Sequence, residues 1–150
     1  MCKLLPGPFD LVLRRSKSKI LKNIFKQRYE NYELKNAGYN DIMDVPHLSG
    51  CFMFIRRNVL EEVGLFDERF FMYMEDVDLS RRIHKYFRTV YWPEVTVYHK
   101  CARDSYVSID AFNYHVFSAF KYFNKWGWFF DRERKKVNKK TVKECSKKIL

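Results

Sequence analysis

The chain has 150 residues, of which 47% are hydrophobic and 18% aromatic, and its formal net charge is +11 at pH 7. This length and apolar content are sufficient for one domain with a real core and exclude an intrinsically disordered protein. The charge lies at the two ends, because residues 1–35 and 131–150 each hold nine Lys or Arg against three Asp or Glu. Basic ends around a nearly neutral middle suit an anionic membrane surface at least as well as nucleic acid.

The cysteines stand too far apart for a CxxC metal or redox motif. The sequence contains nothing that resembles a secretory signal, and no apolar run reaches the roughly 18 residues that suggest a membrane span. These features predict a cytoplasmic protein with reduced thiols, each at a small buried position: Cys2, Cys51, Cys101 and Cys145.

The first 46 residues are predicted to contain one helix. Pro6-Gly7-Pro8 makes Cys2–Asp10 an irregular lead-in. Residues 16–31 are predicted to form an amphipathic helix, because their apolar side chains recur at helical spacing and the lysines mostly lie elsewhere around it. Turn-forming residues then occupy positions 36–46.

The next segments form a predicted strand, a short helix and a loop. Ser49–Ile55 is a compact apolar run, which predicts a buried strand. Asn58 is predicted to cap a short helix that ends at Gly64. Phe66–Met74 follows as a loop dense in aromatic residues.

The second half of the chain is predicted to be mostly helical. Asp76–Tyr86 has a helical period, and Thr89–Trp92 and Val95–Tyr98 are predicted as two short strands. Ser108–Lys125 is predicted to be a helix that is apolar over most of its circumference, so it must be covered by protein or lipid. The basic segment after Phe130 is expected to fray. Four polar residues of the long helix fall at helical intervals and suggest one face: His115, Ser118, Tyr122 and Lys125.

Three carboxylates, Glu75, Asp76 and Asp78, stand where the aromatic loop meets the following helix. A helix N-terminus presents unpaired N–H groups and a partial positive charge, which favour a nearby anion by about 0.3–1 kcal/mol. A carboxylate held there stays ionised and is able to accept a proton. Ordinary acids of a first helical turn are the alternative interpretation, and the neighbouring Phe71 and Tyr73 favour a functional site.

The ordered motifs of residues 45–100 resemble family 2 glycosyltransferases, and within that family they look most like rhamnosyltransferases. The opening segment Leu5–Leu11 also looks like that subgroup. The motifs that carry the resemblance are Ser49–Arg57, Val63–Glu68, Phe70–Leu79, Arg82, the Tyr91-Trp92-Pro93 step and His99.

The resemblance implies an α/β GT-A fold and an inverting single displacement. It makes Asp76, the second acid of the Glu-Asp pair, the catalytic base that removes the proton of the acceptor hydroxyl. His99 would ligate a divalent metal, Mg or Mn, that holds the donor diphosphate and stabilises its charge. A structural histidine is the other interpretation of His99. The resemblance also implies residues that shape or support the acceptor pocket, namely Gly50, Phe71, Tyr73, Glu75 and Asp78.

The family's nucleotide-binding half, which ends in a metal-binding Asp-x-Asp motif, has no counterpart before Ser49. We therefore expect residues 1–125 to be the acceptor-side, catalytic-base portion of a GT-A domain, and residues 126–150 to be an aromatic and then basic tail. On this interpretation the chain is truncated or one piece of a split enzyme, and it is inactive without the missing half.

The implied partners are a nucleotide-diphosphate sugar and a polysaccharide or lipid-linked acceptor, with the protein peripheral at the inner face of the membrane. The alternative function is a non-catalytic remnant that acts as a homo-oligomerising or membrane-surface module. A nucleic-acid binder ranks last, because the sequence contains no helix-turn-helix, RRM-like or zinc pattern.

Overall fold

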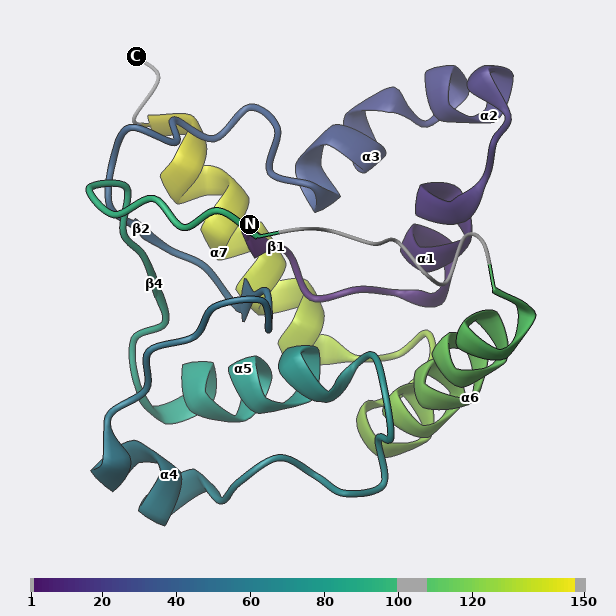
Figure 1. Cartoon of the computed structure of the whole chain (residues 1–150). Coiled ribbons are helices and arrows are strands. Elements are labelled where there is room, and N and C mark those ends of the chain that lie inside the picture. The colour runs from purple at the N-terminus through teal and green to yellow at the C-terminus, as the bar shows by residue number, and fades with distance from the viewer. Residues whose placement is uncertain (1, 100–107, 148–150) are drawn as a thin grey trace.

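The computed structural model of the chain describes residues 2–99 and 108–147 (Figure 1). Helices dominate this part of the chain, and none of them is both long and apolar enough to cross a bilayer. In chain order the elements are β1 (Cys2–Lys3), α1 (Pro8–Arg15), α2 (Lys19–Ile24), α3 (Lys26–Tyr32), β2 (Met43–Asp44), β3 (His47–Leu48), α4 (Arg57–Val63), α5 (Glu75–Tyr86), β4 (Val90–Tyr91), α6 (Ile109–Trp126) and α7 (Arg132–Lys147).

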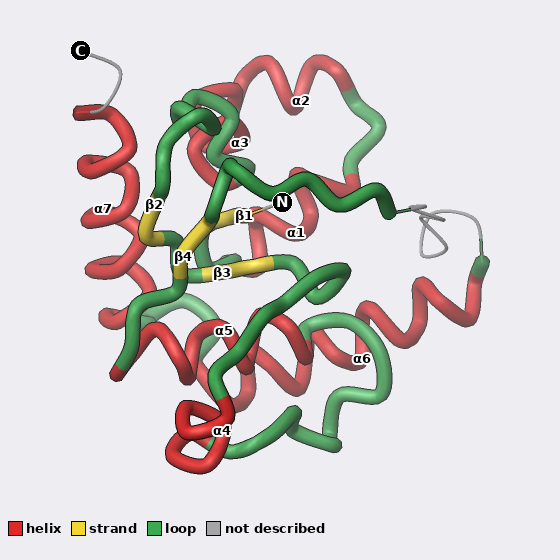
Figure 2. The backbone as a smooth tube through the Cα atoms, turned by 60° about the vertical axis from the view of Figure 1, so that its left-hand side comes forward, coloured by secondary structure: helices red, strands yellow, loops and turns green. Residues whose placement is uncertain are grey.

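The strands form two antiparallel pairs. β1 pairs with β3, so that Cys2 lies opposite Leu48, and β2 pairs with β4, so that Met43 lies opposite Tyr91. The pairs gather at the centre of the molecule, with α7 on one side and α5 below them (Figure 2). The predicted combination of few short strands with flanking helices is confirmed, and it is consistent with part of a glycosyltransferase domain.

The helix α5 is fastened to the strand β3. Its residue Leu79 is fully buried, and Ser80 Oγ accepts the Leu48 N–H at 3.2 Å and donates to the Leu48 carbonyl at 3.3 Å. Two hydrogen bonds to one residue fix the helix in rotation as well as in distance. The first turn of α5 is thereby held beside the end of β3.

Residues 2–10 are ordered rather than the irregular lead-in that the prolines predicted. The strand β1 is buried, and Leu4 N donates to Tyr32 O at 3.1 Å. Pro8 opens the helix α1, where its missing N–H would have had no helical partner. Gly7 N donates to Asp10 Oδ2 at 2.8 Å and so completes the start of that helix.

Three further predictions of secondary structure are wrong. The helix predicted over 16–31 is divided at Phe25. The Phe25 ring packs edge-on against the Phe9 ring, with centroids 4.9 Å apart. The segments Ser49–Ile55 and Val95–Tyr98, predicted as strands, are loops with mostly exposed side chains. An apolar run of that length does not show whether a second backbone segment lies beside it to form a strand pair.

Other predicted boundaries are close to the observed ones. The helix α4 ends at Gly64, which takes a φ of +82°, although Arg56 rather than Asn58 is its N-cap. Ser108, predicted as the first residue of the long helix, is the N-cap of α6, and its Oγ accepts the Ala111 N–H at 3.4 Å. The predicted helix after the aromatic loop is confirmed as α5 and begins at Glu75.

The basic tail forms the helix α7 instead of fraying. Asn138 bonds both backbone groups of Leu5, accepting its N–H and donating to its carbonyl, each at 2.9 Å. Arg134 donates to the Pro6 carbonyl at 3.2 Å, and Cys145 is buried among core residues. Because most residues of the tail are charged, its composition does not indicate that one face of the helix packs on the N-terminal segment.

Two of the cysteines occupy the small buried positions that were predicted. Cys2 and Cys145 belong to the same buried cluster. Cys51 is instead exposed, because the segment predicted as a buried strand is a surface loop. Cys101 lies outside the described residues.

Candidate active site around Asp76

The backbone just before α5 adopts an unusual conformation. Tyr73 and Met74 have φ angles of 66° and 65°, in the left-handed region that costs a non-glycine residue about 1–2 kcal/mol. The Met74 side chain is buried beside Phe70 and Tyr122, and this packing offsets the strain. The chain consequently turns sharply into the helix and presents Glu75 and Asp76 at its start.

The Asp76 carboxylate is held by three groups. Its Oδ2 accepts the Gly50 N–H at 2.9 Å and lies 3.6 Å from His47 Nε2, and its Oδ1 accepts the Val77 N–H at 2.8 Å. The side chain keeps 20% of its surface exposed. Asp76 is therefore fixed in orientation and still accessible to a ligand.

These contacts keep Asp76 ionised. Burial acts to raise the pKa of the carboxyl, but His47 and the N–H groups of Gly50 and Val77 outweigh it and lower the pKa to about 2. At neutral pH the group is a carboxylate. It has the protonation state that a general base requires before reaction.

Gly50 lies against Asp76, as a residue shaping its pocket would. A Cβ built on Gly50 would be 3.1 Å from Asp76 Cβ, which is tighter than ordinary van der Waals contact. Any larger residue would push the carboxylate away from the Gly50 N–H. The glycine thus permits the close approach that forms this hydrogen bond.

Two buried polar side chains beside Asp76 lack hydrogen-bond partners within the described part of the chain. They are His47, at both ring nitrogens, and Glu75, at Oε2. Burial raises the pKa of Glu75. Buried polar groups are normally satisfied, so we expect a water molecule or a polar ligand atom to pair with these atoms.

Asp78 faces a different environment from Asp76. It is fully buried and accepts from Arg82 Nε at 2.9 Å, Lys125 Nζ at 2.7 Å and Trp126 Nε1 at 2.7 Å. The carboxylate joins α5 to α6. Its contacts are structural, and its role as an acceptor-site residue stays a prediction.

The polar face predicted on the long helix is confirmed. Ser118 Oγ donates to Met72 O at 2.7 Å, and Lys125 Nζ pairs with both Asp67 and Asp78. His115 packs its ring against Tyr73, with centroids 5.2 Å apart. The face therefore clamps the aromatic loop that leads into Asp76.

The aromatic residues predicted at the acceptor site differ in exposure. Phe71 is 74% exposed and contacts Tyr114 on α6, with ring centroids 5.0 Å apart. Tyr73 is half-buried beneath His115. Of the two rings, Phe71 is the more exposed, and its role at the acceptor site stays a prediction.

His99 lies in an exposed loop after β4. Among residues 2–99 and 108–147, no three His, Cys, Asp or Glu side chains come together to hold a metal ion. The described residues therefore do not fit a complete metal site. Metal ligation by His99 stays a prediction.

The sequence did not indicate His47 as a site residue, because its spacing from other possible metal ligands matches no known motif. Its relation to Asp76 depends on β3 lying beside α5, and a separation of 29 positions along the chain gives no signal of that contact.

Comparison with known proteins gives one partial match. No protein-family model and no solved structure matches the chain. Over 62 residues, 41% of its length, the chain is 47% identical to curated proteins named N-acetylglucosaminyl-diphospho-decaprenol L-rhamnosyltransferase, from Mycobacterium tuberculosis strains CDC 1551 / Oshkosh and ATCC 25618 / H37Rv. The matched region is 20% of the length of those relatives. This similarity, although restricted to part of the chain, supports a function of the glycosyltransferase type.

Proposed function

We propose that the chain forms the acceptor-side portion of an inverting, rhamnosyltransferase-like GT-A glycosyltransferase, with Asp76 as the catalytic base. The observation that carries the proposal is an ionised, accessible Asp76 carboxylate, oriented by Gly50 and flanked by the unpaired polar atoms of His47 and Glu75. The partial similarity to named rhamnosyltransferases supports the same reaction class.

The reaction is a single displacement at the anomeric carbon of a nucleotide-diphosphate sugar. The acceptor hydroxyl oxygen forms the new bond to carbon, the bond from carbon to the diphosphate oxygen breaks, and the hydroxyl proton passes to Asp76. A carboxyl with a pKa of about 2 is a weak base toward a free alcohol. Asp76 therefore orients the hydroxyl first and takes its proton only after the attacking oxygen has become acidic through bond formation.

A lipid-linked acceptor is the better of the two acceptor classes. The relatives' name specifies an acceptor joined through a diphosphate to decaprenol. The basic ends of this chain suit a protein that works peripherally at an anionic, cytoplasmic membrane face. In the complete enzyme, His99 would contribute to a Mg or Mn site that neutralises the leaving diphosphate.

The test is sugar transfer by an enzyme that contains this segment, with Asp76→Asn compared to the unmodified protein. The amide is nearly isosteric but cannot take the proton, so the rate should fall about 10²–10⁴-fold. Glu75→Gln should cost less. Asp110→Asn, at an exposed acid in the first turn of α6, is the matched control and should leave the rate unchanged. A near-normal rate for Asp76→Asn, or a larger loss for Glu75→Gln, contradicts the assignment.

Exposed apolar side chains favour a second function, a homo-oligomerising module without catalysis. Phe54 is 90% exposed and Leu65 is 71% exposed. Sedimentation equilibrium measures the oligomeric state, and a sugar-transfer assay measures activity. A chain that forms a stable oligomer, and that supports no transfer either by itself or as part of the complete enzyme, favours the module.

A further inference from the structure

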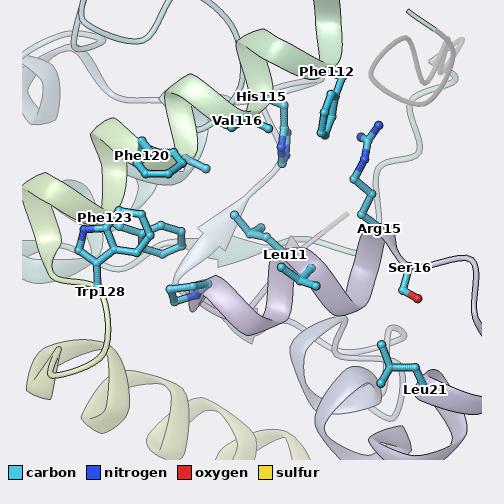
Figure 3. A pocket seen from close by; sticks show the side chains of 13 residues that line it. Leu11, Arg15, Ser16, Leu21, Phe112, His115, Val116, Phe120, Phe123 and Trp128 are labelled. Atoms are coloured by element: carbon cyan, nitrogen blue, oxygen red, sulfur yellow. The ribbon is translucent and has the colours of Figure 1, made fainter. Parts of the chain in front are cut away.

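A large apolar cavity lies outside the Asp76 site, between α6 and the N-terminal helices α1 and α2 (Figure 3). Its volume is about 550 Å³, within the range of about 300–1,000 Å³ that small-molecule sites occupy. Most of its surface is aliphatic or aromatic, and the residues that define its length are Leu11, Phe112, Val116, Phe120, Phe123 and Trp128.

The cavity has a polar end and an apolar end. Arg15 and His115 lie near Phe112 at one end, whereas Phe123 and Trp128 lie at the other (Figure 3). The Arg15 guanidinium stacks on Phe112, with Cζ 4.0 Å from the ring centroid. Burial, followed by the positive charges of Arg14 and Arg15, lowers the pKa of His115 to about 4, so its ring is neutral at pH 7. Among the described residues that line the cavity, Arg15 therefore supplies the positive charge at the polar end.

The polar end adjoins the approach to Asp76. His115 packs against the ring of Tyr73, which stands three residues before Asp76 at the turn into α5. Asp76 is also near enough to His115 to influence its pKa. A molecule whose head binds at Arg15 would therefore have its next groups directed toward the Asp76 side of His115.

We propose that this cavity binds the isoprenoid chain of the lipid-linked acceptor, with Arg15 binding the diphosphate that joins the chain to its sugar. The inference rests on the proposed function and adds the site at which the lipid is recognised. An apolar slot with the Arg15 guanidinium at its end complements an anionic head and a hydrocarbon tail. Guanidinium groups bind phosphate oxygens in a bidentate manner, which suits a diphosphate.

The surroundings of the cavity favour a lipid over a protein segment. Val12 and Phe120 line the cavity and are 61% and 53% exposed, so the slot opens to the surface. The neighbouring helix α2 exposes Ile20 and Ile24 and carries two lysines, Lys19 and Lys22. Apolar side chains mixed with lysines match an anionic bilayer surface, from which an isoprenoid chain enters the slot.

The experiment is calorimetric titration of the full chain with inorganic diphosphate, geranyl diphosphate and farnesyl diphosphate, each below its micelle-forming concentration. Because each added isoprene unit is buried, farnesyl diphosphate should bind at least about tenfold more tightly than geranyl diphosphate. Inorganic diphosphate should bind most weakly. Nuclear Overhauser contacts between the farnesyl methyl groups and the Trp128 indole should locate the tail in the unmodified protein.

Two variants test the two ends. Val12→Trp fills the slot from its exposed wall and should weaken farnesyl diphosphate about tenfold or more. Val95→Trp, at a 64% exposed valine outside the cavity lining, is the matched control and should change the affinity less than about twofold. Arg15→Gln should weaken farnesyl diphosphate about tenfold and leave the binding of farnesol unchanged.

Four outcomes overturn the proposal. They are equal affinity for the three probes, absence of contacts to Trp128, equal effects of Val12→Trp and Val95→Trp, and a dimer that Val12→Trp dissociates while farnesyl diphosphate fails to bind. The last outcome would make the slot an interface between copies of the chain.

Failure of this inference is distinguishable from failure of the proposed function. If farnesyl diphosphate does not bind but transfer depends on Asp76, only the lipid site is wrong. If farnesyl diphosphate binds in a Val12-dependent manner but Asp76→Asn leaves sugar transfer unchanged, only the catalytic assignment is wrong.

Discussion

Asp76 receives more hydrogen-bond donors than an ordinary acid of a first helical turn. Besides the Val77 N–H of its own helix, it accepts the Gly50 N–H from a surface loop, and the His47 ring of β3 lies 3.6 Å away as an ion-pair partner. Donors from separate elements fix the direction of the carboxylate, whereas helix donors alone would leave it free to rotate toward solvent.

The Asp76 carboxylate should stabilise the fold in a pH-dependent way. Its pKa of about 2 lies below the unfolded value of about 3.9, so its contribution is complete above about pH 4 and is lost as the pH falls toward 2. The contribution is about 2–3 kcal/mol. Urea unfolding of the wild type and of Asp76→Asn, repeated from pH 5 to pH 2, should show the difference in stability shrinking over that window. A constant difference would show that the native carboxyl has an ordinary pKa.

Among the elements, α5 and α6 are joined by ion pairs and hydrogen bonds to one carboxylate. Asp78, fully buried, accepts from Arg82, Lys125 and Trp126. Next to it, the buried Arg81 guanidinium pairs with Asp131 at 2.7 Å and with Glu133 at 2.8 Å. The start of α7 is thereby tied to α5, so ion pairs connect α5 to both α6 and α7.

Removing Asp78 should destabilise the ion pairs between α5 and α6. Asp78→Ala leaves Arg82 and Lys125 without a shared buried anion, and we expect a loss of about 3–5 kcal/mol in the free energy of unfolding. Asp110→Ala, at an exposed acid of α6, is the control and should change stability by less than about 0.5 kcal/mol. Urea denaturation measures both. A loss below about 1 kcal/mol for Asp78→Ala would mean that desolvation cancels the ion pairs.

Helix content was predictable from the sequence, but the pairing of elements was not. The spacing of apolar residues predicted α5 and α6. The spacing of polar residues on α6 predicted the face that contacts the aromatic loop. The helix α7 was missed because lysines dominate its composition, although Asn138 and Cys145 face the interior. In the site, Asp76 was identified by its motif, whereas its contact with His47 exists only in the folded chain.

For the whole molecule, we expect that the chain alone does not bind a nucleotide-diphosphate sugar tightly. Its sequence has no Asp-x-Asp motif before Ser49, and the described residues bring together no cluster of metal ligands. Calorimetry with thymidine- and uridine-diphosphate sugars in the presence of Mg²⁺ or Mn²⁺ measures this. A micromolar dissociation constant would show that the chain holds a donor site of its own.

We also expect the chain to bind anionic membranes through its basic and aromatic ends. Phe129 and Phe130 are 66% and 92% exposed, and Lys or Arg near an anionic leaflet contributes about 1 kcal/mol each. Co-sedimentation with vesicles should require anionic lipid and weaken as salt rises. Replacing Phe129 and Phe130 by Ser should reduce binding, whereas the control Phe54→Ser, at a 90% exposed site, should not.

Deleting residues 126–150 is unsuitable as a membrane test, because α7 packs against the N-terminal segment and its loss would unfold the core. Equal binding to neutral vesicles, or binding unaffected by the two Ser substitutions, would show that these phenylalanines are solvent-exposed without contacting lipid.

The bonds between Leu5 and Asn138 also determine when this chain is able to fold during its synthesis. Leu5 leaves the ribosome long before Asn138, since 133 positions separate them. Until α7 emerges, the segment around Leu5 lacks the amide that satisfies its backbone, and Cys2 lacks part of its apolar cover. A growing chain therefore exposes the segment around Leu5 to chaperones while the residues between Leu5 and Asn138 are synthesised, and this part of the core is completed only when α7 emerges.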